Sequence, residues 1–204
     1  MNLLHVDTSI LGTHSVSRQV TAAIVERLRQ DDPGLEVTYR DLAAQPLGHL
    51  VPESLPSDHP LAALATGIDA PAQAASAAVL EQFLSADIIV LGAPMYNCTI
   101  PSQLKAWLDR LLVPGKTFTY SEKGPEGLAG SKRVIAVLSR GGIYGAGVPT
   151  AGGEYVEPVL RTIFGLIGIT NPEFIVAEGV RISPERGAQA LAQALKAARA
   201  LSVA

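Results

Sequence analysis

Hydroxyl side chains gather near the amino terminus, where a short apolar run gives way to a helical pattern. Ser9 follows the apolar run of residues 3–6, and Ser15 and Ser17 stand at the start of the helical pattern. The first N–H groups of a helix lack partners inside it, and together with the helix dipole they attract an anion. This loop therefore favours a phosphate group, although the simpler interpretation is that Ser15 or Ser17 only caps the helix.

Two sharper phosphate-binding motifs are missing from the sequence. Neither Gly-x-Gly-x-x-Gly nor Gly-x-x-x-x-Gly-Lys-[Ser/Thr] occurs, which argues against a dinucleotide-binding Rossmann domain and a P-loop NTPase. No Gly-x-Ser-x-Gly sequence follows an apolar run either, so a Ser-His-Asp hydrolase is disfavoured. A monophosphate tail fits the serine-rich loop better.

Two further loops offer exposed backbone that suits a flat, polar-edged ring. One, Pro94–Cys98, follows an apolar run and leads into an amphipathic helix, and the other, Ser139–Gly145, follows a second apolar run. Gly141 and Gly142 allow the main chain to approach such a ring closely, and the N–H groups of both loops are donors for it. The simpler interpretation of the second loop is an ordinary glycine turn.

These loops require a scaffold that brings the ends of several strands together. Short apolar runs alternate with longer helical patterns, which is typical of repeated βαβ units around a parallel sheet. The predicted strands are Leu3–Val6, Leu35–Tyr39, Asp87–Leu91, Arg133–Leu138 and Phe174–Ala177. The predicted helices lie near residues 15–31, 72–85, 101–112, 153–167 and 184–202. We predict an α/β fold, a three-layer, doubly wound, five-stranded parallel sheet, whose ligand binds where the strands end.

The alternation covers residues 1–204 without an internal linker, so we expect a single domain. Residues 40–69 interrupt it, because they hold four of the fourteen prolines and two of the four histidines. We expect an irregular excursion there with a short helix around Pro60–Leu64, which would act as a lid or a subunit contact. Trp107 lies on the apolar face of a helix, and His5 lies inside a strand, so both are expected in the core.

Composition excludes several classes of partner. A formal net charge of −3 and the lack of a Lys/Arg run give no basic surface for nucleic acid. The single cysteine, Cys98, has no partner for an internal disulfide, and no Cys/His spacing resembles a metal site. No stretch of about 18 apolar residues occurs, so we expect no membrane span. A reducing compartment, the cytoplasm, is the simplest location.

The loop sequences also resemble a known family. The similar segments run through nearly the whole chain in the family's order and spacing, and they are Ser9, Ser15–Ser17, Pro94–Asn97, Ile100–Lys105, Gly115–Phe118, Gly124–Leu128, Ser139–Gly142 and Phe164–Thr170. Together they look like the FMN-dependent NADH:quinone oxidoreductase and azoreductase family. That resemblance implies a flavodoxin-like sheet in the order 2-1-3-4-5, a homodimer, and one FMN for each subunit near the dimer interface.

The resemblance also implies roles for particular residues. By analogy, the FMN phosphate is held by Ser9, Ser15, Val16 and Ser17. The isoalloxazine ring is lined on one side by Pro94, Met95, Tyr96, Asn97 and Cys98, and its pyrimidine edge is held by Ser139, Arg140, Gly141 and Gly142. Many family members carry an aromatic residue where this chain has Cys98. No basic residue stands beside this thiol in the sequence to activate it, so we expect Cys98 to be a contact residue only.

A bound flavin would carry the chemistry, accepting hydride from NADH, with NADPH as the alternative donor, and passing two electrons to an acceptor in a ping-pong cycle. Quinones, azo compounds and nitroaromatics are the acceptors that the resemblance implies. We expect the backbone of Asn97, Gly141 and Gly142 to contact the flavin, and Tyr120 and Phe164 to line the acceptor pocket. Tyr120 lies in a predicted hairpin excursion that would reach the partner subunit's site.

Two alternatives to this enzyme stay open. A flavin reductase that releases reduced FMN would share most of these residues. A non-enzymatic, flavodoxin-like electron carrier would share them too, but such a carrier is expected to present a strongly acidic docking face. A net charge of −3 over 204 residues does not indicate one.

Overall fold

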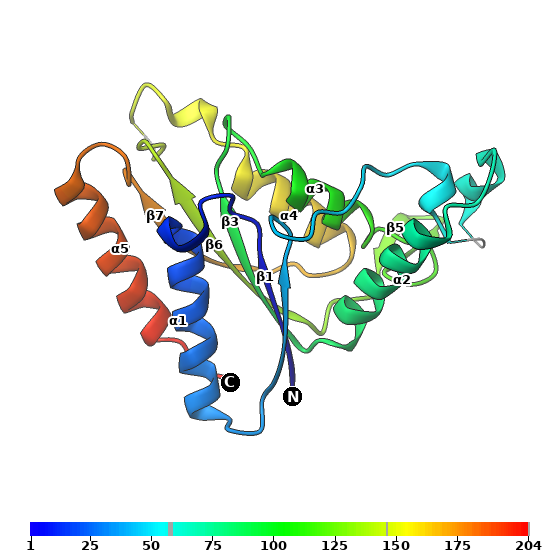
Figure 1. The fold of residues 1–204 in the computed structure, drawn as a ribbon, viewed down its shortest axis with the longest axis horizontal. Helices are drawn as coiled ribbons and strands as arrows, with labels where there is room; N and C mark the ends of the chain where they lie inside the picture. The colour runs from blue at the N-terminus through cyan, green and yellow to red at the C-terminus, as the bar shows by residue number, and fades with distance from the viewer. Residues whose placement is uncertain (57–58, 146, 204) are drawn as a thin grey trace.

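The computed structural model describes residues 1–56, 59–145 and 147–203. Its centre is a parallel sheet of five strands in the order β2-β1-β3-β6-β7, which confirms the predicted sheet (Figure 1). The strands are β1 (Asn2–Asp7), β2 (Glu36–Asp41), β3 (Ile88–Pro94), β6 (Arg133–Arg140) and β7 (Glu173–Glu178). Every residue of the central strand β3 is buried, as expected for a parallel sheet that is covered on both faces.

Helices cover the two faces of this sheet and complete three layers. On one face lie α1 (Val16–Asp31) and α5 (Pro184–Arg199), and on the other lie α2 (Ala70–Ser85), α3 (Ser102–Asp109) and α4 (Val156–Leu166) (Figure 1). Each side has its own apolar core, because alternate residues of the strands point to opposite faces. Trp107 is fully buried in the core beneath α2 to α4, where its ring meets Phe83 edge to face.

Several boundaries differ from those expected. Strand β2 runs on to Asp41, because its last residues continue the register of β1 as far as the pair Asp7 and Asp41. Helix α4 begins at Val156 rather than near 153, because the side chain of Glu154 accepts the N–H groups of Val156 and Glu157 and so caps the helix there.

The segment between β2 and α2 is irregular, as the sequence indicated. It contains two short 3₁₀ helices, η2 (Pro52–Ser54) and η3 (Pro60–Leu64), and leads away from the sheet along α2. Leu61, Leu64 and Ile68 of this segment are exposed. In the described residues, no helix combines the length and the apolar composition that crossing a membrane requires.

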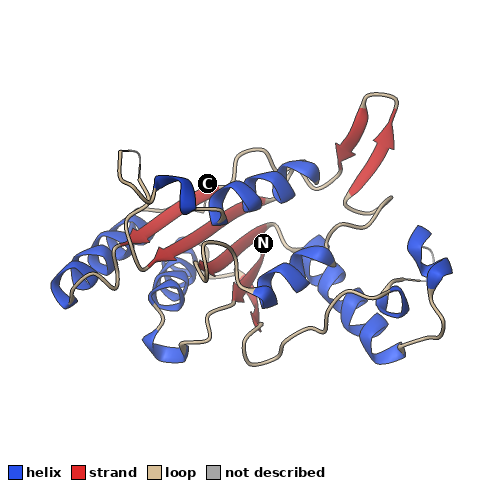
Figure 2. Ribbon diagram, turned by 90° about the horizontal axis from the view of Figure 1, so that it is seen from above, coloured by secondary structure: helices blue, strands red, loops and turns tan. Residues whose placement is uncertain are grey.

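A two-stranded antiparallel hairpin, β4 (Phe118–Ser121) and β5 (Gly124–Gly127), stands off from the body of the molecule (Figure 2). It comes shortly before β6 in the chain, so it lies toward the amino-terminal end of the sheet. The base of the hairpin is packed tightly, since a Cβ on Gly127 would lie 2.0 Å from the backbone nitrogen of Gly168. The N–H of Ala129 also donates to the carbonyl of Ile167, at 2.8 Å.

Candidate functional site

A cavity of about 480 Å³ opens at the carboxyl ends of β1, β3 and β6, where the sequence predicted a ligand. Three loops and the start of α1 form its walls. The lining residues are Ser9, Leu11, His14, Ser15, Val16, Pro94, Met95, Tyr96, Asn97, Cys98, Ser139, Gly141, Tyr144, Val180 and Arg181. Most of the predicted binding residues are therefore brought together around one space, and Ser17, Arg140 and Gly142 lie outside its lining.

The serine-rich end of the cavity is the start of α1. Ser15 caps this helix, since its hydroxyl accepts the N–H of Arg18, and it also lines the cavity. Ser17 is fully buried behind it, with its hydroxyl 3.0 Å from that of Ser15. The N–H groups of Val16 and Ser17, in the first turn, have no acceptor within the described part of the chain. Ser15 can therefore cap the helix while the free N–H groups of the first turn bind an anion.

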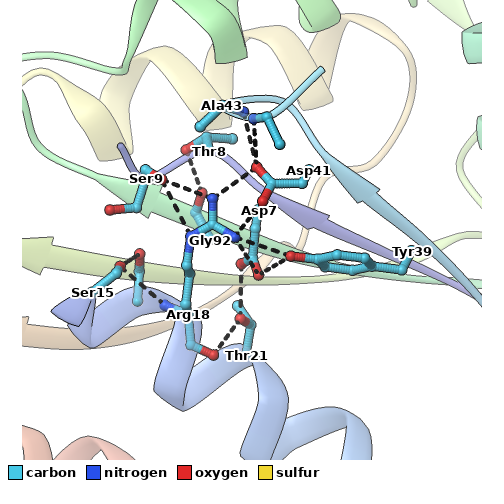
Figure 3. Close-up of polar contacts among 12 residues, drawn as sticks. Asp7, Thr8, Ser9, Ser15, Arg18, Thr21, Tyr39, Asp41, Ala43 and Gly92 are labelled. Atoms are coloured by element: carbon cyan, nitrogen blue, oxygen red, sulfur yellow. Dashed lines mark hydrogen bonds and ion pairs between the residues drawn. The ribbon is translucent and has the colours of Figure 1, made fainter. Parts of the chain in front are cut away.

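Arg18 fixes the loop that carries Ser9. Its guanidinium donates twice to the carbonyl of Ser9, at 2.8 and 3.2 Å, and forms two bonds of 2.7 Å to the carboxylate of Asp41 (Figure 3). The bidentate pair ties the start of α1 to the end of β2. Through its hydrogen bonds, Arg18 holds the pKa of Asp41 below the ordinary value of an aspartate. This brace was not predicted, because Asp41 lies outside the strand that the sequence indicated.

Asp7 is the buried centre of the same network. Its carboxylate, 3% exposed, accepts the hydroxyls of Thr21 and Tyr39 at 2.9 and 3.1 Å. Burial first, and the charge of Asp7 second, raise the pKa of Tyr39 to about 12. A Cβ on Gly92 would lie 2.8 Å from an oxygen of Asp7, so the neighbouring strand needs glycine at this point. His5, expected in the core, is buried with its Nε2 3.4 Å from Asp7.

A tight turn forms the middle of the cavity wall. Tyr96 and Thr99 exchange two backbone hydrogen bonds, of 2.9 and 3.1 Å, and between them Asn97 and Cys98 have φ angles of 49° and 72°. Residues other than glycine rarely adopt this left-handed conformation, and when they do they often lie at functional sites. Both residues line the cavity, and their N–H groups have no acceptor among the described residues.

Tyr96 joins the two ends of the cavity. Its hydroxyl accepts the N–H of Ile10 and lies 3.1 Å from the hydroxyl of Ser9, so a residue of the β3 loop is bonded to the β1 loop. The sequence indicated Tyr96 only as a lining residue. Its linking role depends on how two strands pair, which no local pattern reveals.

The third loop differs in part from the prediction. Gly141 lines the cavity, but the side chain of Arg140 turns away and is buried among glutamates, with nitrogens 3.4 Å from Glu154, 3.6 Å from Glu157 and 3.7 Å from Glu178. A buried cation needs such anionic partners, so the Arg140 side chain does not hold a ligand edge here. The prediction for Arg140 concerned its main-chain N–H, and it stays a prediction.

Gly142 also supports the loop rather than lining the cavity. Its carbonyl accepts the N–H of Gly179, at 2.8 Å. Tyr144, which belongs to the predicted loop Ser139–Gly145, lines the cavity, and so do Val180 and Arg181, which sequence reasoning did not place in the site. An aromatic ring after the glycine pair was a visible signal for Tyr144, whereas Arg181 is brought close only by the pairing of β6 with β7.

The two residues predicted for an acceptor pocket lie elsewhere in the chain. Phe164 is fully buried in the core under α4, so it does not line the cavity and that prediction is corrected. The apolar face of α4 turns it toward the sheet. Tyr120 is 72% exposed on the hairpin, where its ring meets Phe118 edge to face at 5.3 Å. The hairpin lies away from the carboxyl ends of the strands, so Tyr120 is remote from the cavity of its own chain.

The cavity has the features that a long ligand with one anionic end would require. Buried hydroxyls and free N–H groups stand at one end, and backbone donors with apolar contacts such as Met95 stand at the other. Its volume lies within the usual range of small-molecule sites, about 300–1,000 Å³. A wider hollow of about 650 Å³ adjoins it and shares Tyr96 and Asn97.

Comparison with known proteins agrees with this architecture. A family model described as a flavodoxin-like fold matches residues 1–201. The chain is 60% identical to "FMN-dependent NADH:quinone oxidoreductase 2" of Bradyrhizobium diazoefficiens and 57% identical to "FMN-dependent NADH:quinone oxidoreductase" of Methylorubrum extorquens, over 100% of each chain. Among solved structures it resembles the azoreductase AzrA, with a TM-score of 0.85, 29% identity and coverage of 98% and 97%. An azoreductase from Bacillus anthracis is similar, with a TM-score of 0.82, 30% identity and coverage of 98% and 100%.

Proposed function

Because this chain belongs to the flavodoxin-like family of FMN-dependent NADH:quinone oxidoreductases, we propose that it binds FMN in the 480 Å³ cavity and reduces quinones with NADH. One observation carries the proposal. A single cavity joins a serine-rich helix start, suited to a phosphate, to a turn whose two left-handed residues present free N–H groups. Bound FMN supplies a ring that accepts a hydride and passes on two electrons.

Ser9, Ser15 and Val16 hold the phosphate in this proposal. The hydroxyl of Ser15 and the N–H of Val16 lie at the positive end of α1, which favours the doubly charged group. Ser17 acts from behind, by fixing the hydroxyl of Ser15 at 3.0 Å. Arg18 does not reach the phosphate directly but holds the Ser9 loop in place through two bonds to its carbonyl.

Backbone groups of Asn97, Cys98 and Gly141 contact the polar edges of the ring. Donors that are held in place before the reaction stabilise negative charge as it develops, without the cost of reorganisation. The turn at Asn97 and Cys98 leaves two N–H groups at the cavity wall without an acceptor among the described residues. Pro94, Met95 and Tyr96 line the same side, and Ser139 lies at the end of β6. No side-chain acid is required.

We propose further that the enzyme is a homodimer and that the cycle is ping-pong. Azo and nitroaromatic compounds bind in the same acceptor slot as quinones, next to the FMN cavity. The adjoining hollow, with Ile10 and Ile100 in its walls, gives space for a flat acceptor. The hairpin of a second subunit would close this slot with Tyr120, which is exposed and remote from its own cavity. NADH is the proposed donor, with NADPH as a possible second one, and the cytoplasm is the proposed location.

The test of this proposal is a reduction and reoxidation experiment on the purified protein. We expect the FMN-loaded protein to stay yellow through desalting, to be bleached by NADH without oxygen, and to recover its colour with benzoquinone. Loss of the flavin at each turnover would indicate a flavin-releasing reductase, and lack of bleaching by NADH would indicate an electron carrier. A colourless protein that gives no heat on titration with FMN would refute the binding site itself.

A further inference from the structure

A second cavity is lined by residues 50–56 and 59–61 of the irregular segment, by helix α2 and by residues 109–113 at the end of α3. It has a volume of about 220 Å³. Its walls are mainly apolar, and they are formed by Leu50, Leu55, Leu61, Leu80, Leu112 and Val113. It shares no lining residue with the proposed FMN cavity, although Leu50 and Asp109 line both this cavity and the 650 Å³ hollow. An inference that rests on Arg110 does not depend on the proposed function.

Two charged side chains, those of Arg110 and Asp109, line this mainly apolar space together with the polar side chains of His59 and Ser76. Arg110, at the end of α3, is 4% exposed and lines the cavity. Its Nε donates to the hydroxyl of Ser76 at 3.1 Å, and its Nη1 donates to the carbonyl of Ala106 at 2.7 Å. Within the described residues, its Nη2 has no acceptor, and no carboxylate lies within ion-pair distance of the guanidinium. Burial lowers the pKa of Arg110.

Two other arginines of this protein, Arg18 and Arg140, have the anionic partners that Arg110 lacks. Arg18 is paired with Asp41 at 2.7 Å, and Arg140 is surrounded by three glutamates. A buried cation without an anionic partner is costly, because it has lost water and gained no opposite charge. The neighbouring Asp109 acts on Arg110 only as a nearby charge, because its carboxylate is paired with Lys105 and forms no hydrogen bond or ion pair with the guanidinium. Arg110 therefore carries unused capacity to bind an anion.

We propose that this cavity binds a small amphipathic carboxylate, with its carboxylate on Arg110 and its apolar body among the leucines. A guanidinium matches a carboxylate with two parallel donors, which suits this head group. The volume of about 220 Å³ exceeds the roughly 150 Å³ in which an apolar cavity holds benzene, so one aromatic ring fits. His59 supplies a second donor, because its Nδ1 accepts the N–H of Leu61 and the proton of the neutral ring is then on Nε2.

Benzoate and its neutral isostere benzamide test the proposal on the FMN-loaded protein. We expect benzoate to give saturable heat in calorimetry and to raise the Tm, and we expect benzamide to bind at least about tenfold more weakly, since it lacks the charge. The visible spectrum of the flavin should stay unchanged, because the two cavities are separate. Equal binding of both compounds, no saturation with benzoate, or a perturbed flavin spectrum would overturn the proposal.

Two variants locate the site. Leu61→Trp fills the cavity and leaves Arg110 intact, and it should abolish benzoate binding. Leu64→Trp is the matched control, because Leu64 lies in the same 3₁₀ helix, is 67% exposed and does not line the cavity. Arg110→Gln should remove the preference for benzoate over benzamide. If Arg110→Gln fails to fold, the comparison of Leu61→Trp with Leu64→Trp still tests the location of the site. Unchanged benzoate affinity in Leu61→Trp would contradict the proposed site.

Discussion

At the scale of single residues, the hydroxyl of Tyr96 links the two ends of the proposed FMN site. Replacing Tyr96 by Phe removes the contacts with Ser9 and Ile10 and leaves the ring in place. One or two hydrogen bonds contribute about 0.5–1.5 kcal/mol each, so we expect FMN to bind roughly three- to tenfold more weakly. Quenching of flavin fluorescence measures this. Tyr155→Phe, at a tyrosine that is 54% exposed and outside the cavity, is the control and should leave the affinity unchanged.

Ser15 has two roles that a matched pair of variants separates. Ser15→Ala removes the cap of α1 and a proposed phosphate donor, so we expect lower stability without FMN, by about 1 kcal/mol, and weaker FMN binding. Ser183→Ala removes the equivalent cap of α5, at a residue that does not line the cavity, and should lower only the stability. Combining Ser15→Ala with Ser17→Ala should weaken FMN retention further. Equal FMN affinity in Ser15→Ala and Ser183→Ala would contradict the phosphate assignment.

Residues near the ends of strands were easier to place from the sequence than side chains whose direction depends on tertiary contacts. Ser9 and the turn at residues 95–98 come just after strands, and Ser15 begins the helix that follows β1. The ends of parallel strands meet at one edge, so the position of these residues was predictable. The position of Arg140 at the end of β6 was predictable in the same way. Its side-chain direction depends on glutamates from α4 and β7, which only the folded chain brings near. The prediction that Phe164 lines an acceptor pocket failed for a similar reason, because the way α4 packs on the sheet decides which of its side chains are buried.

At the scale of elements, the pair Arg18 and Asp41 braces α1 against β2. Because its pKa is depressed in the folded protein, Asp41 binds a proton more readily when the chain is unfolded. Its contribution to stability is therefore present above its ordinary pKa of 3.8 and is lost as the pH falls through and below that value. Asp41→Asn should lower the free energy of unfolding at neutral pH by about 1–3 kcal/mol.

The difference between wild type and Asp41→Asn should shrink as the pH falls below 4, and urea unfolding at several pH values measures it. Glu81→Gln, an exposed carboxylate of α2, is the control for removing one negative charge. A difference that stays constant down to pH 2 would show that the carboxylate of Asp41 does not carry the stabilisation.

The elements themselves were the most predictable part of the fold. Continuous apolar runs identified the five strands, and Ser or Pro signals located the starts of α1, α3 and α5. The turn residues of the hairpin indicated it in the sequence. The close contact between Gly127 of the hairpin and Gly168 was not predictable, because Gly168 lies in the loop after α4. The cavity at Arg110 was not predictable, because the segment 42–69 has no periodic pattern that would place its leucines over α2 and α3.

At the scale of the whole molecule, one subunit does not complete the proposed acceptor site. The cavity lies at the carboxyl ends of the strands, whereas the hairpin precedes β6 and stands at the opposite end (Figure 2). Tyr120 can therefore act on the proposed reaction only at the site of a second subunit. This makes the homodimer and the acceptor pocket a single hypothesis, which a mixed dimer tests.

Two complementary variants form that mixed dimer. Tyr120→Ala keeps the FMN site but loses the hairpin ring, and its homodimer should show a KM for quinone that is about three- to tenfold higher, with full flavin content. Ser15→Ala with Ser17→Ala keeps the hairpin but retains little FMN. When both chains are co-expressed with different tags, the only loaded site faces an intact Tyr120 from its partner, so its KM should return to the wild-type value.

Tyr120→Phe is the control, and its homodimer should keep the wild-type KM. If the mixed dimer retains the raised KM, the hairpin does not serve the neighbouring site, and loss of flavin from Tyr120→Ala would mean that the ring is structural.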